Sequence, residues 1–136
     1  MFLLDTNVVS ELRRPRPHEG ALAWLQVQQD EDLFVSALTI GEIQLGVERA
    51  RRQDPIKANE IEGWLDQMVR TLRIIVHDAE TYRIWARLLA GKPDTNPENA
   101  LIAACAKRND LTVVTLNVKH FRLFDVPVLD PFEHTG

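Results

Sequence analysis

Oxygen-bearing side chains at five separated positions of this sequence are the groups that could do chemistry together. Hard divalent cations prefer oxygen ligands, and Mg²⁺ needs one or two carboxylates because it keeps several waters. A bound cation of this kind polarises a phosphoryl oxygen and makes water more acidic, which supplies a nucleophile for in-line attack on a phosphodiester. The five candidates are Asp5, Glu42, Asn99, Thr115 and Asn117.

The elements that must position these residues alternate along the chain. Apolar runs predict strands over residues 2–4, 33–35, 74–76, 112–115 and 127–129. Periodic apolar positions and helix-start signals predict helices over 8–12, 19–29, 38–52, 55–73, 78–89 and 97–109. Strands separated by helices imply parallel βαβ units. We therefore expect one domain over residues 1–136, a three-layer α/β/α sandwich around a mostly parallel sheet of four to five strands.

The carboxyl edge of such a sheet would gather the candidates. Asp5 ends the first predicted strand, which begins at the very start of the sequence, and Thr115 ends the fourth, with Asn117 two residues on. If these two strands are neighbours, Asp5 and Asn117 face each other where ligands bind in open α/β sheets. Glu42 lies in the first turns of the helix after the second strand, and Asn99 opens the helix before the fourth.

Each candidate also has a local structural interpretation. Asp5 could cap the following helix, and Thr39-x-x-Glu42 matches a capping box in which the glutamate bonds the Thr39 backbone N–H. Asn96-x-x-Asn99 could be helix-start chemistry, and Asn117 could be a turn residue after a strand. Because all of these positions would meet at one sheet edge, we favour a shared site.

Composition limits the class of protein. The 136 residues are 45% hydrophobic and 26% charged, as in ordinary globular proteins. No apolar run approaches the roughly 20 residues of a membrane span, and the single Cys105 favours a cytoplasmic protein with a buried thiol. The net charge of −4 argues against sequence-independent nucleic-acid binding. Four basic clusters could nevertheless hold phosphates around an acidic centre: Arg13–Arg16, Arg49–Arg52, Lys107–Arg108 and Lys119–Arg122.

Four segments together resemble the PIN-domain ribonucleases of the bacterial VapC/FitB toxin type. They are LDTNVVSEL (4–12), SALTIGEI (36–43), ALIAA (100–104) and VTLNVKHF (114–121), and they follow the family's order along the whole chain. The resemblance implies a PIN-like α/β/α sandwich with an acidic pocket, Mg²⁺ or Mn²⁺, and endonucleolytic cleavage of RNA. It also implies a small cognate antitoxin and a homodimer within a larger type II toxin–antitoxin assembly, with no membrane partner.

The resemblance also assigns roles by position. Asp5 and Glu42 match the first two acidic residues of the family's pocket, so we expect Asp5 to be the principal metal ligand. Glu42 would bind the metal directly or through water, or orient the attacking water. Thr115 matches the family's hydroxyl position and Asn117 the polar position near the fourth acidic site, so both would hold water. Basic residues expected to position the RNA backbone are Arg13, Arg14 and Arg49.

One position departs from the family pattern. Asn99 stands where the family has an aspartate, three residues before Ile102. An asparagine offers a carbonyl oxygen but carries no charge and cannot act as a base. Glu98 is adjacent but points about 100° away around a helix, which makes it a poor substitute. Asn99 therefore implies either a weakened metal site or an inactivated form, with Asn99 as a metal-position residue in both cases.

Other functions fit the residues less well. A phosphotransfer receiver domain needs paired acids after the first strand, which Asp5-Thr6-Asn7 lacks, and Asp78 is better interpreted as a helix cap than as a phosphoacceptor. A haloacid-type phosphatase needs a second aspartate where this chain has Asn7. The main alternative is a catalytically silent PIN fold that binds an antitoxin or RNA without cleavage. Apolar residues that could form its binding surfaces are Trp24, Leu45 and Trp64.

Overall fold

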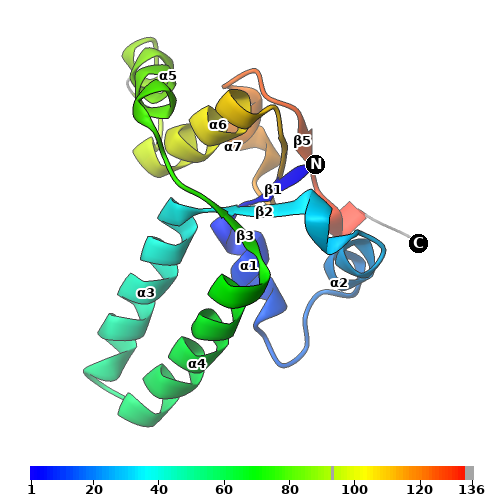
Figure 1. The fold of residues 1–136 in the computed structure, drawn as a ribbon, viewed down its shortest axis with the longest axis vertical. Coiled ribbons are helices and arrows are strands. Elements are labelled where there is room, and N and C mark those ends of the chain that lie inside the picture. The colour runs from blue at the N-terminus through cyan, green and yellow to red at the C-terminus, as the bar shows by residue number, and fades with distance from the viewer. Residues whose placement is uncertain (93, 134–136) are drawn as a thin grey trace.

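A five-stranded parallel sheet forms the centre of the computed structural model, which describes residues 1–92 and 94–133 (Figure 1). The strands lie in the order β3-β2-β1-β4-β5, and every neighbouring pair is parallel. Their bounds are β1 (Phe2–Leu4), β2 (Leu33–Ser36), β3 (Arg73–Ile75), β4 (Thr112–Val114) and β5 (Val128–Leu129). The first and fourth strands are adjacent, with Leu4 paired to Val114.

Helices cover both faces of the sheet. The helices are α1 (Thr6–Leu12), α2 (Glu19–Gln26), α3 (Ala37–Arg51), α4 (Pro55–Thr71), α5 (Ala79–Ala90), α6 (Pro97–Asn109) and α7 (Val118–Arg122). One buried cluster joins Leu3 to α6 and α7, and the other joins Leu4 to α1 and α4. This alternation follows from the strand geometry, because successive side chains point to opposite faces. The predicted three-layer α/β/α sandwich is therefore confirmed.

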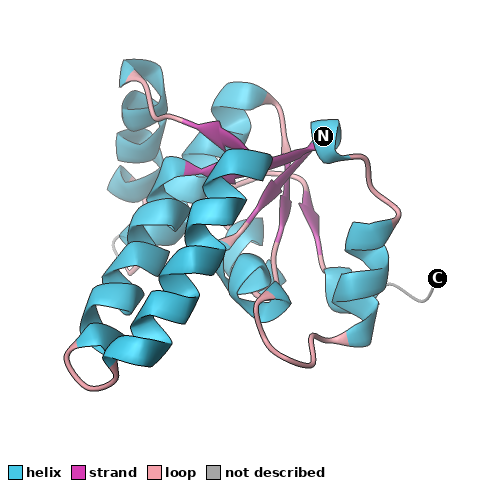
Figure 2. Cartoon of the chain, turned by 60° about the horizontal axis from the view of Figure 1, so that its bottom comes forward, coloured by secondary structure: helices cyan, strands magenta, loops and turns pink. Residues whose placement is uncertain are grey.

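The helices α3 and α4 pack side by side as an arm that extends away from the sheet (Figures 1 and 2). The turn between them spans residues 52–54, and Asp54 caps α4 by accepting a hydrogen bond from the Lys57 backbone N–H. Among the described residues, no helix is both long enough and apolar enough to cross a bilayer. The arm brings charged residues together at a distance from the carboxyl edge of the sheet.

Several predicted boundaries were wrong by a few residues. The helix expected over 19–29 ends at Gln26, and a short 3-10 turn (Asp30–Asp32) precedes β2. The strand expected over 74–76 lies at Arg73–Ile75, which leaves Val76 exposed. The helix α7 was not predicted, because five residues are too few to show a helical period. Its place is fixed by Phe121, which is fully buried.

Candidate active site

The carboxyl edge of the sheet carries a small polar cavity of about 240 Å³, which we call the acidic pocket. It opens where β1 meets α1, beside α3, the start of α6 and the turn after β4. The residues that line it are Asp5, Thr6, Asn7, Glu42, Glu98, Asn99, Ile102 and Asn117. Four of the five sequence candidates are thus brought together here. The fifth, Thr115, lies directly behind Asp5.

The Asp5 side chain both caps α1 and lines the acidic pocket. It is the N-cap of α1, and its Oδ1 accepts a hydrogen bond from the Thr6 backbone N–H at 2.8 Å. Its Oδ2 accepts a hydrogen bond from the Thr115 hydroxyl at 2.9 Å, and that hydroxyl accepts one from the Asn117 backbone N–H at 3.0 Å. Asp5 is 5% exposed and Thr115 is fully buried. The capping interpretation is confirmed, and it leaves the carboxylate facing the pocket.

Glu42 is held by a chain of threonine hydroxyls. The Thr6 hydroxyl donates to Glu42 Oε1 at 2.8 Å and lies 2.9 Å from the hydroxyl of the buried Thr39. With Thr6 donating to Glu42, Thr39 must donate to Thr6. The capping-box interpretation is wrong, because Ser36 is the N-cap of α3 and accepts from the Leu38 backbone N–H at 3.0 Å. The Glu42 side chain is therefore directed toward the pocket.

The start of α6 places two neighbouring side chains at the pocket. Asn96 caps the helix by accepting a hydrogen bond from the Asn99 backbone N–H at 3.0 Å, which leaves the Asn99 amide side chain free of that role. Glu98 lines the pocket beside Asn99, contrary to the expectation that the helical rotation would direct it elsewhere. Both residues lie in the first turn of α6, so the helix end itself borders the cavity.

The electrostatics of the pocket are those of crowded negative charge. Burial raises the pKa of Asp5, against the hydrogen bonds from Thr115 and Thr6 and the nearby charge of His120. Burial also raises the pKa of Glu42; the Thr6 bond opposes this, while the charges of Asp5 and Glu98 add to it. Across residues 1–92 and 94–133, no lysine or arginine forms an ion pair with these three carboxylates. A cation is the natural missing counter-charge.

The donor set suits a hard cation with several waters. Within the part of the chain that the structure describes, no three His, Cys, Asp or Glu side chains are gathered closely enough to hold a metal ion between them. Mg²⁺ does not require such a cage, because it uses one or two carboxylates and retains waters. Asp5 and Glu42 supply carboxylate oxygens at the pocket, and Asn99 supplies an amide oxygen. The residues present therefore fit Mg²⁺ or Mn²⁺.

Two residues that were not among the five sequence candidates, Thr6 and Asn7, also belong to the site. Thr6 orients Glu42, as described above. Asn7 lines the pocket, and its side chain bridges to the turn after β4 by accepting a hydrogen bond from the Leu116 backbone N–H at 3.3 Å. The signal was present in the sequence, because three polar residues directly after a buried strand all lie at the sheet edge.

The basic clusters do not encircle the pocket. Arg14 pairs with Glu11 at 3.1 Å, and Arg108 pairs with Asp78 at 3.1 Å. Lys107 donates a hydrogen bond to the Asp125 carbonyl. None of the three expected RNA-positioning residues lines the pocket; they are Arg13, Arg14 and Arg49. In contrast, the cluster at residues 119–122 lies on α7, directly after the pocket residue Asn117.

The three apolar residues predicted to form binding surfaces differ in how far they are buried. Trp24 is buried in the core against Phe2, so its proposed surface role is wrong. Leu45 is 50% exposed on α3. Trp64 is partly buried and lines an apolar groove of about 280 Å³ between α1, α2 and α4.

Comparison with known proteins identifies a family that shares this sequence and architecture. The model of the PIN domain family matches residues 2–125. The chain is 37% identical to the protein named Toxin FitB of Neisseria gonorrhoeae, over 97% of this chain and 99% of that one. It is 31% identical to VapC ribonuclease Y4jK of Sinorhizobium fredii, over 98% and 99%. The crystal structure of FitAcB from Neisseria gonorrhoeae matches with a TM-score of 0.87 and 36% identity, over 98% and 99%.

Proposed function

Since this chain belongs to the PIN domain family, we propose that it is the toxin of a type II toxin–antitoxin pair and a metal-dependent endoribonuclease. The observation that carries the proposal is the acidic pocket, where Asp5, Glu42 and Glu98 meet without a basic partner among the described residues. Relatives similar over nearly their full length bear the names Toxin FitB and VapC ribonuclease.

The pocket residues would bind and orient. Asp5 would be the principal ligand, with its two oxygens fixed by Thr6 and Thr115. Glu42 would present the oxygen that Thr6 does not engage, and Asn99 would add its amide oxygen. A divalent cation held there, Mg²⁺ or Mn²⁺, would offset the carboxylate charge and polarise the scissile phosphate. Thr115, buried behind Asp5, would fix the carboxylate through its hydrogen bond, and Asn117 would hold water at the pocket through its polar atoms.

Asn99 sets the strength of the proposed site. Asn99 has a neutral amide where an aspartate would have a carboxylate, so the pocket holds one negative charge fewer than it would with an aspartate at this position. Glu98 supplies a charge at the rim, but it is exposed, and its attraction for a cation is therefore screened by water. We infer a weakened metal site that still supports slow cleavage.

Assembly with a protein partner is part of the same proposal. A structure described as FitAB bound to an IR36 DNA fragment matches this chain at a TM-score of 0.88 and 33% identity, over 100% of this chain and 99% of that one. We infer a small cognate antitoxin for this chain, and a homodimer of the chain within a larger toxin–antitoxin assembly.

One observation favours a second candidate, a PIN fold that binds without cleavage. Asn99 places an uncharged amide at the pocket, where it binds a cation more weakly than a carboxylate would. Such a protein would hold RNA or its antitoxin in the same place and would cut nothing. Its binding would not depend on a divalent cation.

Metal titration and RNA cleavage separate the two candidates. Mn²⁺ is titrated calorimetrically into the unmodified protein, into Asp5→Asn and into Asn99→Asp, and cleavage of a structured RNA is followed with Mn²⁺ or with EDTA. Mn²⁺ binding and EDTA-sensitive cleavage that Asp5→Asn removes would support the nuclease. If even Asn99→Asp binds no Mn²⁺ and leaves the RNA intact, the chain is a binding module.

A further inference from the structure

A second cavity adjoins the acidic pocket on the side of α7, and we call it the α7 cavity. It has a volume of about 570 Å³ and shares Asn117 with the acidic pocket as a lining residue. Ligand pockets typically have volumes of roughly 300–1,000 Å³, so the α7 cavity is large enough for one nucleotide. Its walls come from α7, from β5 and from the short turn Pro131–Glu133. A strand leaving the acidic pocket past Asn117 would enter this space.

Positive side chains concentrate on one wall of the α7 cavity. Lys119, His120 and Arg122 all line it, and all three are exposed. The buried Phe121 fixes α7 against the core, so its polar neighbours stay on the solvent side. His120 also acts on the acidic pocket, since its charge lowers the pKa of Asp5. The two cavities thus share a lining residue, and a charge in one acts on a carboxylate in the other.

These cations are available for a ligand. Within the described ranges, Lys119 and Arg122 form no ion pair with the protein's own carboxylates. What distinguishes these two cations from other lysines and arginines without an ion pair is their place, because both line the cavity that adjoins the acidic pocket. A phosphate group is the ligand that charge-assisted hydrogen bonds from lysine and arginine recognise best.

The other wall of the α7 cavity is apolar with acidic ends. Val128 and Leu129 of β5 offer aliphatic surface. Asp130 and Glu133 carry negative charge, and Asp130 Oδ1 accepts a hydrogen bond from the Phe132 backbone N–H at 2.8 Å. Like charges repel, so a phosphate would lie on the α7 side and a flat apolar group on the β5 side. A nucleotide has both parts in one molecule.

We propose that the α7 cavity binds the nucleotide next to the scissile phosphate of single-stranded RNA. Lys119 and Arg122 hold the backbone phosphate, and the base packs against Val128 and Leu129. This inference rests on the proposed ribonuclease function and adds where the substrate strand lies. The physical need is clear, because three carboxylates in the acidic pocket repel RNA, and cations beside the pocket offset that repulsion.

RNA binding by charge-neutral variants tests the proposal. A fluorescein-labelled single-stranded RNA of mixed sequence is titrated by anisotropy, with every protein carrying Asp5→Asn so that the probe is not cut. Lys119→Gln with Arg122→Gln should weaken binding roughly tenfold to a hundredfold. The slope of log affinity against log salt should fall by about 0.7 for each phosphate that the variant no longer neutralises. The matched control is Arg83→Gln with Arg87→Gln on α5, which removes the same charge and should change neither quantity.

The outcomes also separate this inference from the proposed function. Equal losses in both pairs would show diffuse electrostatics and overturn the α7 site, and so would unchanged affinity in the α7 pair, which would leave the cavity to a protein partner. Thermal melting checks that each variant is folded. With Asp5 intact, the α7 pair should bind Mn²⁺ as tightly as the parent. Failure of both the parent and Asn99→Asp to bind Mn²⁺ would contradict the nuclease proposal, while the anisotropy comparison would still test the α7 site.

Discussion

Two glutamates on the same helix show how differently this molecule treats negative charge. Glu42, near the start of α3, faces the acidic pocket, where burial raises its pKa and the charges of Asp5 and Glu98 add to the effect. Glu48, further along α3, has its pKa lowered by hydrogen bonds from Arg51 and Gln44. Glu48 has a basic partner within the protein, so it contributes to the packing of the helices. Glu42 has no basic partner among the described residues, so it can attract a cation from solution.

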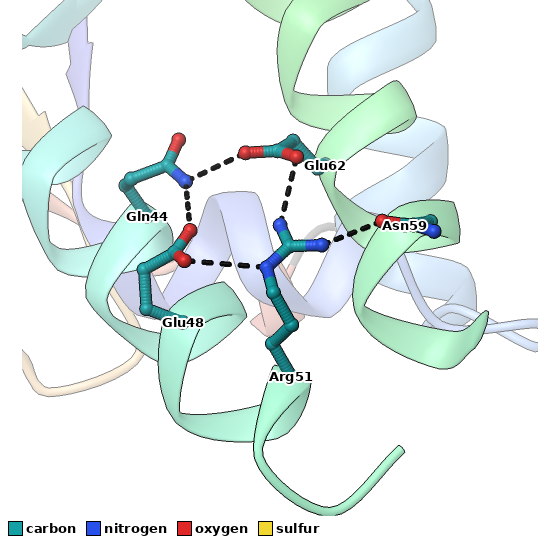
Figure 3. A network of polar contacts seen from close by, with 5 residues as sticks. All are labelled: Gln44, Glu48, Arg51, Asn59 and Glu62. Carbon is teal, nitrogen blue, oxygen red and sulfur yellow. Dashed lines mark hydrogen bonds and ion pairs between the residues drawn. The ribbon is translucent and has the colours of Figure 1, made fainter. Parts of the chain in front are cut away.

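The arm shows carboxylates that receive a basic partner and amide donors from the protein itself (Figure 3). Arg51 donates to Glu48 at 3.2 Å, to Asn59 at 2.6 Å and to Glu62 at 2.8 Å. Gln44 donates to both glutamates, at 2.7 Å to Glu48 and 2.8 Å to Glu62. This network ties α3 to α4 and surrounds its carboxylates with donors. The acidic pocket, in contrast, has hydroxyl and backbone donors but no guanidinium among its lining residues.

The largest expected difference between the two regions is in metal binding. Glu42→Gln should weaken Mn²⁺ binding and RNA cleavage by about a hundredfold or more, because it removes a carboxylate at the proposed metal. Glu48→Gln, the matched change on the same helix, should leave both unchanged. Calorimetric titration of Mn²⁺ and an RNA cleavage assay measure these effects. Similar losses in the two variants would mean that helix integrity matters more than the pocket, and the comparison would fail.

Asn99→Asp should change metal binding in the opposite direction. The substitution adds a carboxylate to the acidic pocket, so we expect Mn²⁺ affinity to rise about tenfold, with faster cleavage. Asn59→Asp is the control, because it adds the same charge in the arm, where the Asn59 side chain already accepts from Arg51. The control should bind Mn²⁺ as the parent does. Equal activity in the parent and Asn99→Asp would mean that the third acidic position lies elsewhere.

The sequence could predict the pocket because its residues follow simple rules of placement. Asp5 and Thr115 follow two buried strands, and parallel strands end at a common edge, so their meeting needed only the correct strand order. The position of Glu98 at the pocket could not be predicted in this way. Its position depends on how α6 is oriented relative to the sheet. The rotation of about 100° between successive helical residues does not give that orientation.

The arm's network was equally hidden from the sequence. The contacts within α3 are readable from spacing, since Glu48 and Arg51 are three residues apart on a helix. The contact between Arg51 and Glu62 depends on how two helices cross, which is set by side-chain packing between them. The helix α7 was missed for a related reason, because its position comes from the burial of Phe121 and not from a repeat of apolar residues.

The two glutamates should also have opposite effects on stability without metal. Since the folded pKa of Glu42 is raised above 4.5, its ionisation weakens the fold as the pH rises through that folded value. Glu42→Gln should therefore raise the Tm near neutral pH. Below the ordinary pKa of 4.5, Glu42 is protonated in both states and the difference should fade.

For Glu48 the sign is reversed. Its folded pKa is lowered, so its stabilising effect is present above the ordinary value of 4.5 and is lost as the pH falls through the folded value. Glu48→Gln should therefore lower the Tm near neutral pH and have no effect in acid. Thermal melts in EDTA from acid to neutral pH check both signs. Changes of the same sign in the two variants would contradict the contrast drawn between them.

The smallest expected effect is the loss of the guanidinium at the centre of the arm. Arg51→Gln removes the cation between Glu48 and Glu62, but these side chains are partly exposed, and ion pairs at a surface contribute little. We expect the Tm to fall by no more than about 2 °C at low salt, and by less at high salt, where the pair is screened. Lys57→Gln, which removes a looser surface pair with Glu60 on α4, should have a still smaller effect.

Mn²⁺ affinity should be the same in the parent, Arg51→Gln and Lys57→Gln, because Arg51 and Glu42 lie toward opposite ends of α3. A measurable change in Mn²⁺ affinity in Arg51→Gln would show that the arm helps to position Glu42. The acidic pocket and the arm would then be coupled, and Glu42 and Glu48 would differ only in how strongly each affects Mn²⁺ binding.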